Sequence, residues 1–375
     1  MKKGLTIFKY SLVFLLVFFL LYSCGEEKPI TRAAPLVRVL IGIAKFAEIN
    51  TTDYVLIYNN RRELGSGRVF IKLSNDNIIV NEIPFPASFP VEIAPVSFFE
   101  LNGRKYRGNL VLYPTNQTIY FINVLDVESY LYGVVPSEIY PGWHKETIKA
   151  QSVVARTYAL YELTFSKNKG KIFDVYDDTR SQVYKGISGE VESVRNIINE
   201  TFGEVLRYEG RIIRAFFHSA SGGMTESSKE YFGVEWPYLV SVSSKFSETY
   251  PENKWEYSVK KNKFAKTFGL NDVNSIKILE RTSSKRIKKL ALIDSEGVTN
   301  FFDGKELRAK LGETNVKSLR CNVILTNDRV LIWGYGYGHG VGFAQWDAQG
   351  MALEGYDYRS ILIFFFPGCK IEKVW

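Results

Sequence analysis

Alternating hydrophobic and polar positions predict that the first part of the chain is built from strands. From Leu36 to about Pro114, short apolar or alternating runs recur, as in VRVLIGI, YVLIYNN and RVFIKLS. Asparagine and glycine, which favour turns, separate these runs, as in LSNDN and LNGRKY. Successive residues of a strand face opposite sides of a sheet, so this pattern indicates sheets with one buried face.

The clearest helix is predicted at Glu146–Leu163, in the sequence ETIKAQSVVARTYALYEL. Its apolar residues cover nearly the whole circumference, which is typical of a buried helix. Gln151 and Arg156 interrupt this apolar surface. A buried arginine has to be paired or to face a cleft, and we expect Arg156 to face a groove and to contact a ligand or Glu138. The alternative is that Arg156 snorkels or pairs within the core.

The remaining chain mixes short helices with strands. A helix is expected at Val191–Thr201, and SIKILERTSSKRIKKLALID reads as a hairpin that turns at Thr282–Lys285. DGKELRAKLG predicts a short helix, VILTNDRVLIWGYGYGHG a pair of strands, and AQGMALEGYDYRSILIFFFPG two short helical pieces. We therefore expect an α+β fold, a strand-rich body with a central buried helix and a groove. Residues 36–375 would form one unit, with a strand-rich part at about 36–115 and a core at about 116–375.

Composition adds limits to this picture. The chain of 375 residues is 46% hydrophobic and 15% aromatic, which suits a β-rich core, a lining of aromatic side chains that stack on sugars, or both. No basic stripe interleaved with aromatic residues is present, so we expect no nucleic-acid partner. Cys321 and Cys369 can form one disulfide, and so few cysteines exclude both a disulfide framework and a cysteine-rich zinc site.

The N-terminus has the pattern of an export signal. Lys2, Lys3 and Lys9 precede a short apolar run, Tyr10–Tyr22, that is shorter than the roughly 20 residues of a membrane span. The run ends in LYSCG, which resembles the lipobox at which bacterial lipoproteins are cut and lipidated, here on Cys24. We expect residues 1–24 to be a lipoprotein signal peptide and residues 25–35 a tether.

The alternatives to a lipoprotein signal are an uncleaved anchor and an ordinary signal peptide. All three place the folded part outside the cytoplasm, in the cell envelope, and the lipobox favours a membrane-anchored lipoprotein. Removal of residues 1–23 would take away three lysines and no acidic residue, which lowers the formal net charge from +8 to +5. A mild positive charge suits an anionic polymer or a membrane surface.

Glycines alternate strictly in Gly334–Gly342, GYGYGHGVG. In an extended strand, all of them would lie on one face, and Tyr335, Tyr337 and His339 would line the other. A bare face allows close approach of a ligand or of another backbone, so either a ligand site or a tightly packed internal strand fits this pattern. The spacing fits neither a dinucleotide-binding nor a phosphate-binding loop.

The segment AFFHSASGG leads from an apolar strand into a small polar turn. It lacks the strand–nucleophile–helix signature of a serine hydrolase. His144, His218 and His339 are weak evidence for a metal, because there is no HExxH motif and no cysteine support. We expect no metal and no cofactor.

A single carboxylate, Glu138, lies between Pro136 and Pro141 in the apolar stretch GVVPSEIYPGW. The two prolines are expected to keep the backbone out of a continuous helix or sheet ladder. Apolar neighbours raise the pKa of a carboxyl group, and a raised pKa suits a general acid near neutral pH. The alternative is a glutamate at a helix N-terminus or in a salt bridge.

In chain order, these segments resemble the SpoIID/LytB family, whose founding member is stage II sporulation protein D. GVVPSEIYPGWHKETIKAQSVVARTYAL resembles the signature block of the family. DDTRSQVYKG, AFFHSASGGMTESSKEYFG, GKELRAKLG and GYGHGVGFAQWDAQGMALEGYDYRSILIFFFPG resemble its later blocks. The resemblance covers roughly residue 36 to the end.

The resemblance implies a peptidoglycan lytic transglycosylase that acts on glycan strands without stem peptides and leaves 1,6-anhydro ends. It implies that Glu138 is the catalytic residue. It also implies a set of residues that line the substrate groove, namely Gln151, Arg156, Gln182, Tyr184, His218, Ser219, Ser221, Gly222, Gly223, His339, Gly340 and Gln345.

One carboxyl group suffices for this reaction. A hydrolytic glycosidase generally needs two carboxylates, whereas here the muramic C6 hydroxyl attacks its own anomeric carbon and no water has to be activated. Two other interpretations remain open: a non-catalytic glycan-binding module that enhances an N-acetylmuramoyl-L-alanine amidase, and a purely structural envelope lipoprotein. The expected partners are glycan strands, a cell-wall amidase and, through a lipid anchor, a membrane.

The sequence also departs from the pattern of the family. The turn AFFHSASGG lacks the cysteines that help some sporulation members to bind zinc, so we expect no structural metal there. The usual GHGVGMSQYGAQG is GHGVGFAQWDAQG here, with Phe343, Ala344, Trp346 and Asp347 in place of familiar residues. These changes concern substrate detail more than the fold.

Overall fold

The computed structural model describes residues 33–74, 77–115 and 117–375. Residues 34–374 form one compact unit of mixed helices and strands, which confirms the predicted α+β class. The predicted signal peptide, Cys24 and all but the last residues of the tether lie outside the described residues. Within the described residues, no helix has the length and apolar character needed to cross a membrane.

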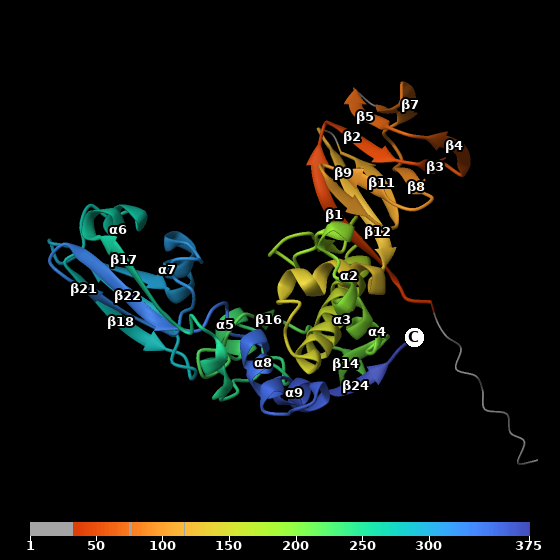
Figure 1. The fold of residues 1–375 in the computed structure, drawn as a ribbon. Helices are drawn as coiled ribbons and strands as arrows, with labels where there is room; N and C mark the ends of the chain where they lie inside the picture. The colour runs from red at the N-terminus through yellow and green to blue at the C-terminus, as the bar shows by residue number, and fades with distance from the viewer. Residues whose placement is uncertain (1–32, 75–76, 116) are drawn as a thin grey trace, which may run out of the picture. The chain divides into compact units, whose positions relative to one another are not determined.

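Two sheets form the N-terminal part (Figure 1), and their strands are antiparallel except for the parallel pair β1 (Leu36–Ala44) and β13 (Val175–Tyr176). In spatial order, the seven-stranded sheet contains β13, β1, β12 (Ile119–Asp126), β11 (Asn109–Pro114), β8 (Val91–Pro95), β3 (Asp53–Tyr58) and β4 (Arg61–Ser66). The six-stranded sheet contains β10 (Arg104–Tyr106), β9 (Phe99–Leu101), β2 (Phe46–Thr51), β5 (Val69–Ser74), β6 (Asn77–Val80) and β7 (Ile83–Pro86).

The predicted alternation is visible in these strands. In β5, for example, Val69 and Ile71 are buried whereas Phe70 and Lys72 are exposed. Tyr58 of one sheet contacts Phe85 of the other, with ring centroids 5.1 Å apart. The seven-stranded sheet continues across the predicted division at residue 115, because β12 pairs with β1 and β11.

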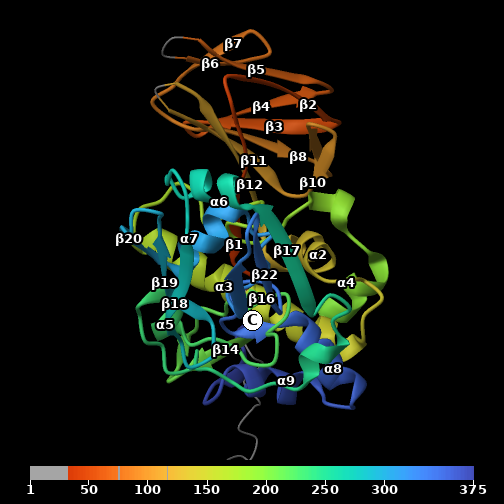
Figure 2. The ribbon, with the colours of Figure 1, turned by 90° about the vertical axis from the view of Figure 1, so that its left-hand side faces the viewer.

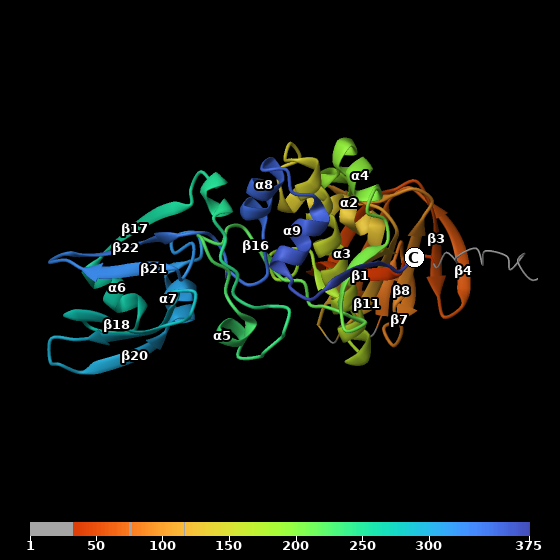
Figure 3. The ribbon, with the colours of Figure 1, turned by 90° about the horizontal axis from the view of Figure 1, so that it is seen from below.

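A helical core follows the sheets. α2 (Val127–Glu138) leads directly from β12, and α3 (Lys145–Asn168) is buried over most of its length. α3 contains the predicted helix at 146–163 and extends beyond it at both ends. α8 (Gln345–Leu353) and α9 (Tyr358–Phe365) both pack against α3, as Figures 1 and 3 show. The two terminal helical pieces were predicted, and the structure confirms them.

Short elements complete this core. The remaining helices and turns are η1 (Gly186–Gly189), α4 (Glu192–Asn199), α5 (Ser228–Phe232) and η2 (Phe246–Thr249). Its strands are β14 (Glu204–Tyr208), β15 (Arg211–Ile212) and β24 (Lys370–Lys373) in one small sheet, and the parallel pair β16 (Phe217–His218) and β23 (Phe343–Ala344).

Residues 254–335 form a lobe, whose helices and strands are labelled in Figures 1 and 2. The lobe has its own hydrophobic core. The chain enters and leaves it through paired residues, Lys254 opposite Tyr335. Its elements are β17 (Lys254–Lys260), α6 (Lys261–Thr267), β18 (Ser275–Arg281), β19 (Ile287–Ile293), β20 (Thr299–Asp303), α7 (Gly304–Leu311), β21 (Cys321–Leu325) and β22 (Arg329–Tyr335). The predicted hairpin, helix and strand pair of this region are confirmed.

Cys321 and Cys369 are both buried and free. Cys321 belongs to the core of the lobe, whereas Cys369 belongs to the core around α3, so the two thiols lie in different clusters.

The glycine segment is not the extended strand that its alternation predicted. β22 ends at Tyr335, and Gly336, Gly338, Gly340 and Gly342 all have positive φ, between 74° and 107°. A side chain at Gly342 would place its Cβ 2.3 Å from the carbonyl oxygen of Phe216. The glycines are required because the chain turns in a left-handed conformation against another backbone.

Candidate functional site

Glu138 is the last residue of α2 and lines a hollow of about 390 Å³. Pro136 lies inside the last turn of this helix, so the expectation that the prolines keep the glutamate out of a helix is wrong. The helix tolerates Pro136 because this residue lies close to the end of α2. The hydroxyl of the next residue, Ser137, donates a hydrogen bond to the carbonyl of Gly133 (2.8 Å). Ile139 is extended, and the chain leaves the helix immediately after the acid.

Burial raises the pKa of Glu138 to about 7. The backbone N–H of Val183 donates to Glu138 Oε1 (2.6 Å), and this bond and the charge of Lys185 lower the pKa, although by less than burial raises it. The carbonyl end of α2 also disfavours a negative charge at this place. Among the described residues that line the hollow, Glu138 is the single acid. It therefore has the properties of a general acid near neutral pH.

The raised pKa predicts a pH-dependent cost in stability. The folded protein keeps the Glu138 proton up to about pH 7, whereas the unfolded chain releases it above about pH 4.5. Between these values the folded state binds more protons, so the free energy of unfolding falls as the pH rises. Relative to Glu138→Gln, the wild type should lose about 3 kcal/mol between pH 4 and pH 8.

Urea denaturation of both proteins at a series of pH values measures this difference. The amide of the variant can still accept the hydrogen bond from Val183 and does not titrate. Parallel stability curves for the two proteins would show that the carboxyl group of Glu138 has an ordinary pKa.

Two of the predicted site residues line the hollow with Glu138, and two more are connected to it through a neighbouring residue. Ser219 and Gln345 line the same hollow, and the Gln345 amide donates to the carbonyl of Glu138 (3.3 Å) and to Gln151 Oε1 (3.4 Å). Gln182 precedes Val183 and accepts a hydrogen bond from the Tyr130 hydroxyl (3.3 Å). The side-chain nitrogens of Gln151 and Gln182 are buried without a partner among the described residues.

Arg156 does not face the hollow, and the expectation that it contacts Glu138 is wrong. Its side chain is fully buried and forms a two-pronged ion pair with Glu128, with Nε–Oε1 at 2.9 Å and Nη2–Oε2 at 2.8 Å. Nη1 also donates to the carbonyl of Glu204 (3.1 Å). Because α3 is buried on all sides around Arg156, the guanidinium pairs within the core, with Glu128 of α2.

Tyr184 is also buried behind the site. Its hydroxyl donates to Asn123 Oδ1 (2.9 Å), and its ring packs on Tyr106 and Tyr130. The other predicted residues that are not among those lining the hollow are Gln151, Gln182, His218, Ser221, Gly222, Gly223, His339 and Gly340. That these residues contact a glycan strand stays a prediction.

His218 is buried and His339 is partly buried, neither lines the hollow, and both are neutral. The N–H of Val341 donates to His339 Nδ1 (3.0 Å), so Nε2 carries the proton and donates to the carbonyl of Phe217 (2.9 Å). Burial lowers the pKa of His339 to about 4 and lowers the pKa of His218 well below its usual value. His144 caps the N-terminus of α3. Within the described parts of the chain, no cluster of three or more metal-ligating side chains occurs.

The aromatic residues of the hollow were not among the predicted site residues. Tyr140, Trp143, Tyr250, Tyr337 and Trp346 line it together with Glu138. Tyr140 and Trp143 stand within five positions of the acid, and this proximity was the available signal. Tyr250 lies in a segment far away in the sequence and carried no signal, whereas Tyr337 belongs to the glycine segment, whose alternation was compatible with a ligand site.

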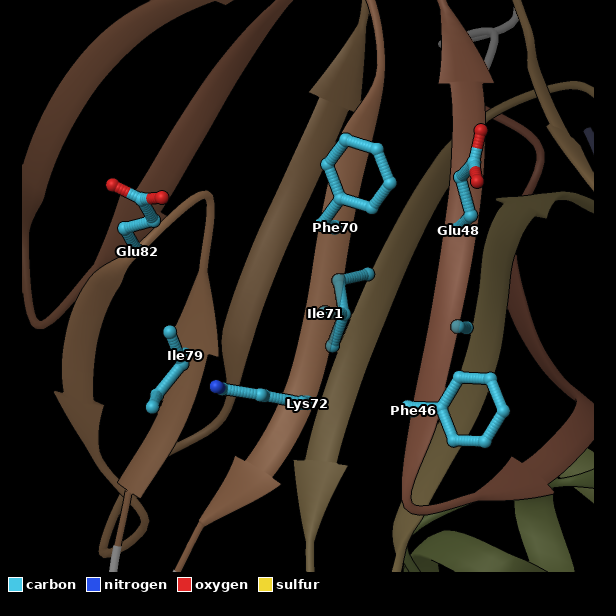
Figure 4. A pocket seen from close by; sticks show the side chains of 8 residues that line it. Phe46, Glu48, Phe70, Ile71, Lys72, Ile79 and Glu82 are labelled. Carbon is cyan, nitrogen blue, oxygen red and sulfur yellow. The ribbon is translucent and has the colours of Figure 1, made fainter.

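A larger hollow, of about 580 Å³, lies on the outward face of the six-stranded sheet (Figure 4). Phe46 and Phe70 extend from neighbouring strands and are 76% and 55% exposed. Of its two carboxylates, Glu48 forms an ion pair with Arg68. None of the predicted site residues lies there, so we assign the chemistry to the smaller hollow around Glu138.

Comparison with known proteins gives concordant matches. The sequence profile of the family described as "Stage II sporulation protein" matches residues 115–208, which include Glu138. The chain is 35% identical over 278 residues to an uncharacterised protein of Brachyspira hyodysenteriae, which covers 73% of this chain and 74% of that protein.

Two relatives come from Bacillus subtilis. The chain is 29% identical over 265 residues to stage II sporulation protein D, across 66% of this chain and 75% of that protein. It is 28% identical over 292 residues to a protein named Amidase enhancer, across 65% of this chain but only 40% of that protein.

Proposed function

The chain belongs to the SpoIID/LytB family, and from this membership and the geometry of Glu138 we propose that it is a lytic transglycosylase of peptidoglycan. Its substrate would be a glycan strand without stem peptides, cleaved between N-acetylmuramic acid and N-acetylglucosamine. The observation that carries the proposal is one isolated carboxyl group with a pKa of about 7 in a hollow that contains no second acid among its described lining residues.

One carboxyl group can perform both proton transfers. Glu138 protonates the glycosidic oxygen as the bond between this oxygen and the anomeric carbon breaks. The C6 hydroxyl of the same muramic ring attacks the anomeric carbon and gives its proton to the carboxylate of Glu138. The acid returns to its starting state, no water is consumed, and the product ends in a 1,6-anhydro ring.

The experiment is incubation of the full-length chain with purified glycan strands that carry no stem peptides, followed by mass spectrometry. Formation of 1,6-anhydro-muramyl ends is the expected result. Binding of the strands without any new anhydro ends would instead favour a second candidate, a glycan-binding module that enhances an amidase. The similarity to the protein named Amidase enhancer supports this alternative.

We propose further that the protein is held at the outside of a membrane by lipidation of Cys24. The motif LYSCG after a short apolar run supports this location. The full-length chain should be recovered in the membrane fraction of cells that produce it. Cys24→Ser should lose the incorporated fatty acid, and unchanged fatty-acid labelling of this variant would reject the assignment.

A further inference from the structure

Three aromatic side chains form one wall of the hollow that contains Glu138. We call Tyr140, Trp143 and Trp346 the aromatic wall. Their ring centroids lie 4.7 Å apart for Trp143–Trp346, 5.7 Å for Tyr140–Trp143 and 6.0 Å for Tyr140–Trp346. Tyr140 is 64% exposed, and both tryptophans are partly exposed. So much exposed aromatic surface beside an acid is costly in water and indicates a ligand.

The backbone holds Trp346 in place on both sides. Its N–H donates to the carbonyl of Ser219 (2.9 Å), and its carbonyl accepts a hydrogen bond from Thr249 Oγ1 (2.8 Å). The ring of Tyr250 packs against the indole, with centroids 5.2 Å apart. A side chain fixed in this way loses little conformational entropy when a ligand stacks on it.

The next residue, Asp347, strengthens this anchoring. It is fully buried and accepts hydrogen bonds from the Ser221 N–H (3.0 Å), the Ser221 hydroxyl (2.6 Å) and the Ser244 hydroxyl (2.5 Å). Trp346 and Asp347 are adjacent residues in the first turn of α8. Trp346 supplies an aromatic face to the hollow, and Asp347 ties the start of α8 to the turn at Ser221.

The composition of the hollow fits a sugar ring. A pyranose presents C–H groups on its faces and hydroxyl groups around its rim. The negative face of an aromatic ring attracts such C–H groups. Ser137, Ser219 and Gln345 line the same hollow and offer hydrogen-bonding side chains to the rim. Flat apolar surfaces with a few convergent polar groups are typical of a small-molecule site.

We propose that Tyr140, Trp143 and Trp346 form a stacking subsite that holds one pyranose ring of an N-acetylated glycan beside Glu138. This inference rests on the proposed function, because it takes the glycan as the ligand of the hollow. It adds which side chains hold the sugar and assigns Trp346 as the rigid member of the subsite.

The test uses chitotetraose, a β-1,4-linked N-acetylglucosamine chain, and the full-length protein with Glu138→Gln, so that no sugar is cleaved. Calorimetry gives the Kd, and tryptophan fluorescence reports stacking on the wall. We expect Trp346→Ala in this background to raise the Kd roughly tenfold or more, the loss typical of an aromatic anchor. Tyr140→Ala should also raise it, and because Tyr140 is exposed its removal should leave folding intact.

Trp333→Phe is the matched control, because this tryptophan lies on β22 in the lobe and should leave the Kd and the fluorescence change unaltered. Values of Kd within twofold of the parent for both Trp346→Ala and Tyr140→Ala would overturn the subsite. Loss of affinity in both variants would support it even if the wild type produced no anhydro ends, in which case only the proposed catalysis would fail. Formation of anhydro ends at an unchanged rate by Trp346→Ala would overturn the subsite alone.

Discussion

Glu138→Gln should reduce the formation of 1,6-anhydro ends by at least about 10²-fold, the contribution typical of one general acid. The amide has nearly the same shape and can accept the same hydrogen bond from Val183. It cannot protonate the glycosidic oxygen and cannot accept the C6 proton. Because no second acid lines the described hollow, no other side chain replaces it. Mass spectrometry of digested glycan strands measures the effect.

The pH dependence of the wild type gives an independent readout of the same group. A carboxyl group with a pKa of about 7 is protonated below pH 7, so cleavage should decline as the pH rises above this value. Glu192→Gln is the matched control, because it makes the same chemical change on the exposed side of α4 and should leave cleavage unaltered. Cleavage by Glu138→Gln at the rate of the wild type would remove Glu138 from the mechanism.

The family and most elements could be predicted from local sequence. The blocks around PSE and GHGVG predicted the family, and the profile match and the relatives confirm it. α3, the hairpin β18–β19 and the terminal helices followed from periodicity and turn residues, which act over a few positions. The raised pKa of Glu138 followed from its apolar neighbours in the chain, several of which are buried in α2.

Contacts between distant segments could not be predicted in the same way. Gln345 meets Glu138 across 207 positions, and nothing in either segment specifies the other. The aromatic wall is assembled from the same two segments. The alternation of glycines gave a misleading prediction, because strict alternation is compatible both with a strand and with a series of left-handed turns. Only the packing against Phe216 and Ala220 distinguishes the two.

The contact made by the Arg156 side chain could not be predicted from local sequence either. A helix that is buried on every side has no polar face, so periodicity gives no information about where one arginine points. The partner, Glu128, stands in the first turn of α2, where it reads as an ordinary acid near a helix N-terminus. The motif that contains Arg156 is therefore better explained by the core that supports α2 and Glu138 than by contact with a ligand.

Arg156→Ala should lower the free energy of unfolding by about 3–5 kcal/mol, the range expected when one partner of a buried ion pair is removed. The carboxylate of Glu128 would keep its hydrogen bond from the N–H of Gly203 (3.0 Å) but lose the guanidinium that balances its charge. The carbonyl of Glu204 would lose a donor as well. Urea denaturation of the wild type and the variant measures the loss.

The double variant Arg156→Met with Glu128→Gln separates charge from packing. It removes both charges, fills the space of the arginine stem and leaves an acceptor for Gly203, so it should recover a large part of the lost stability. Lys229→Ala, which breaks an exposed ion pair with Glu235, should leave the free energy of unfolding unchanged within error. If Arg156→Ala instead kept the stability of the wild type and lost affinity for chitotetraose, the arginine would act on the ligand, and the role of Arg156 in supporting α2 would have to be abandoned.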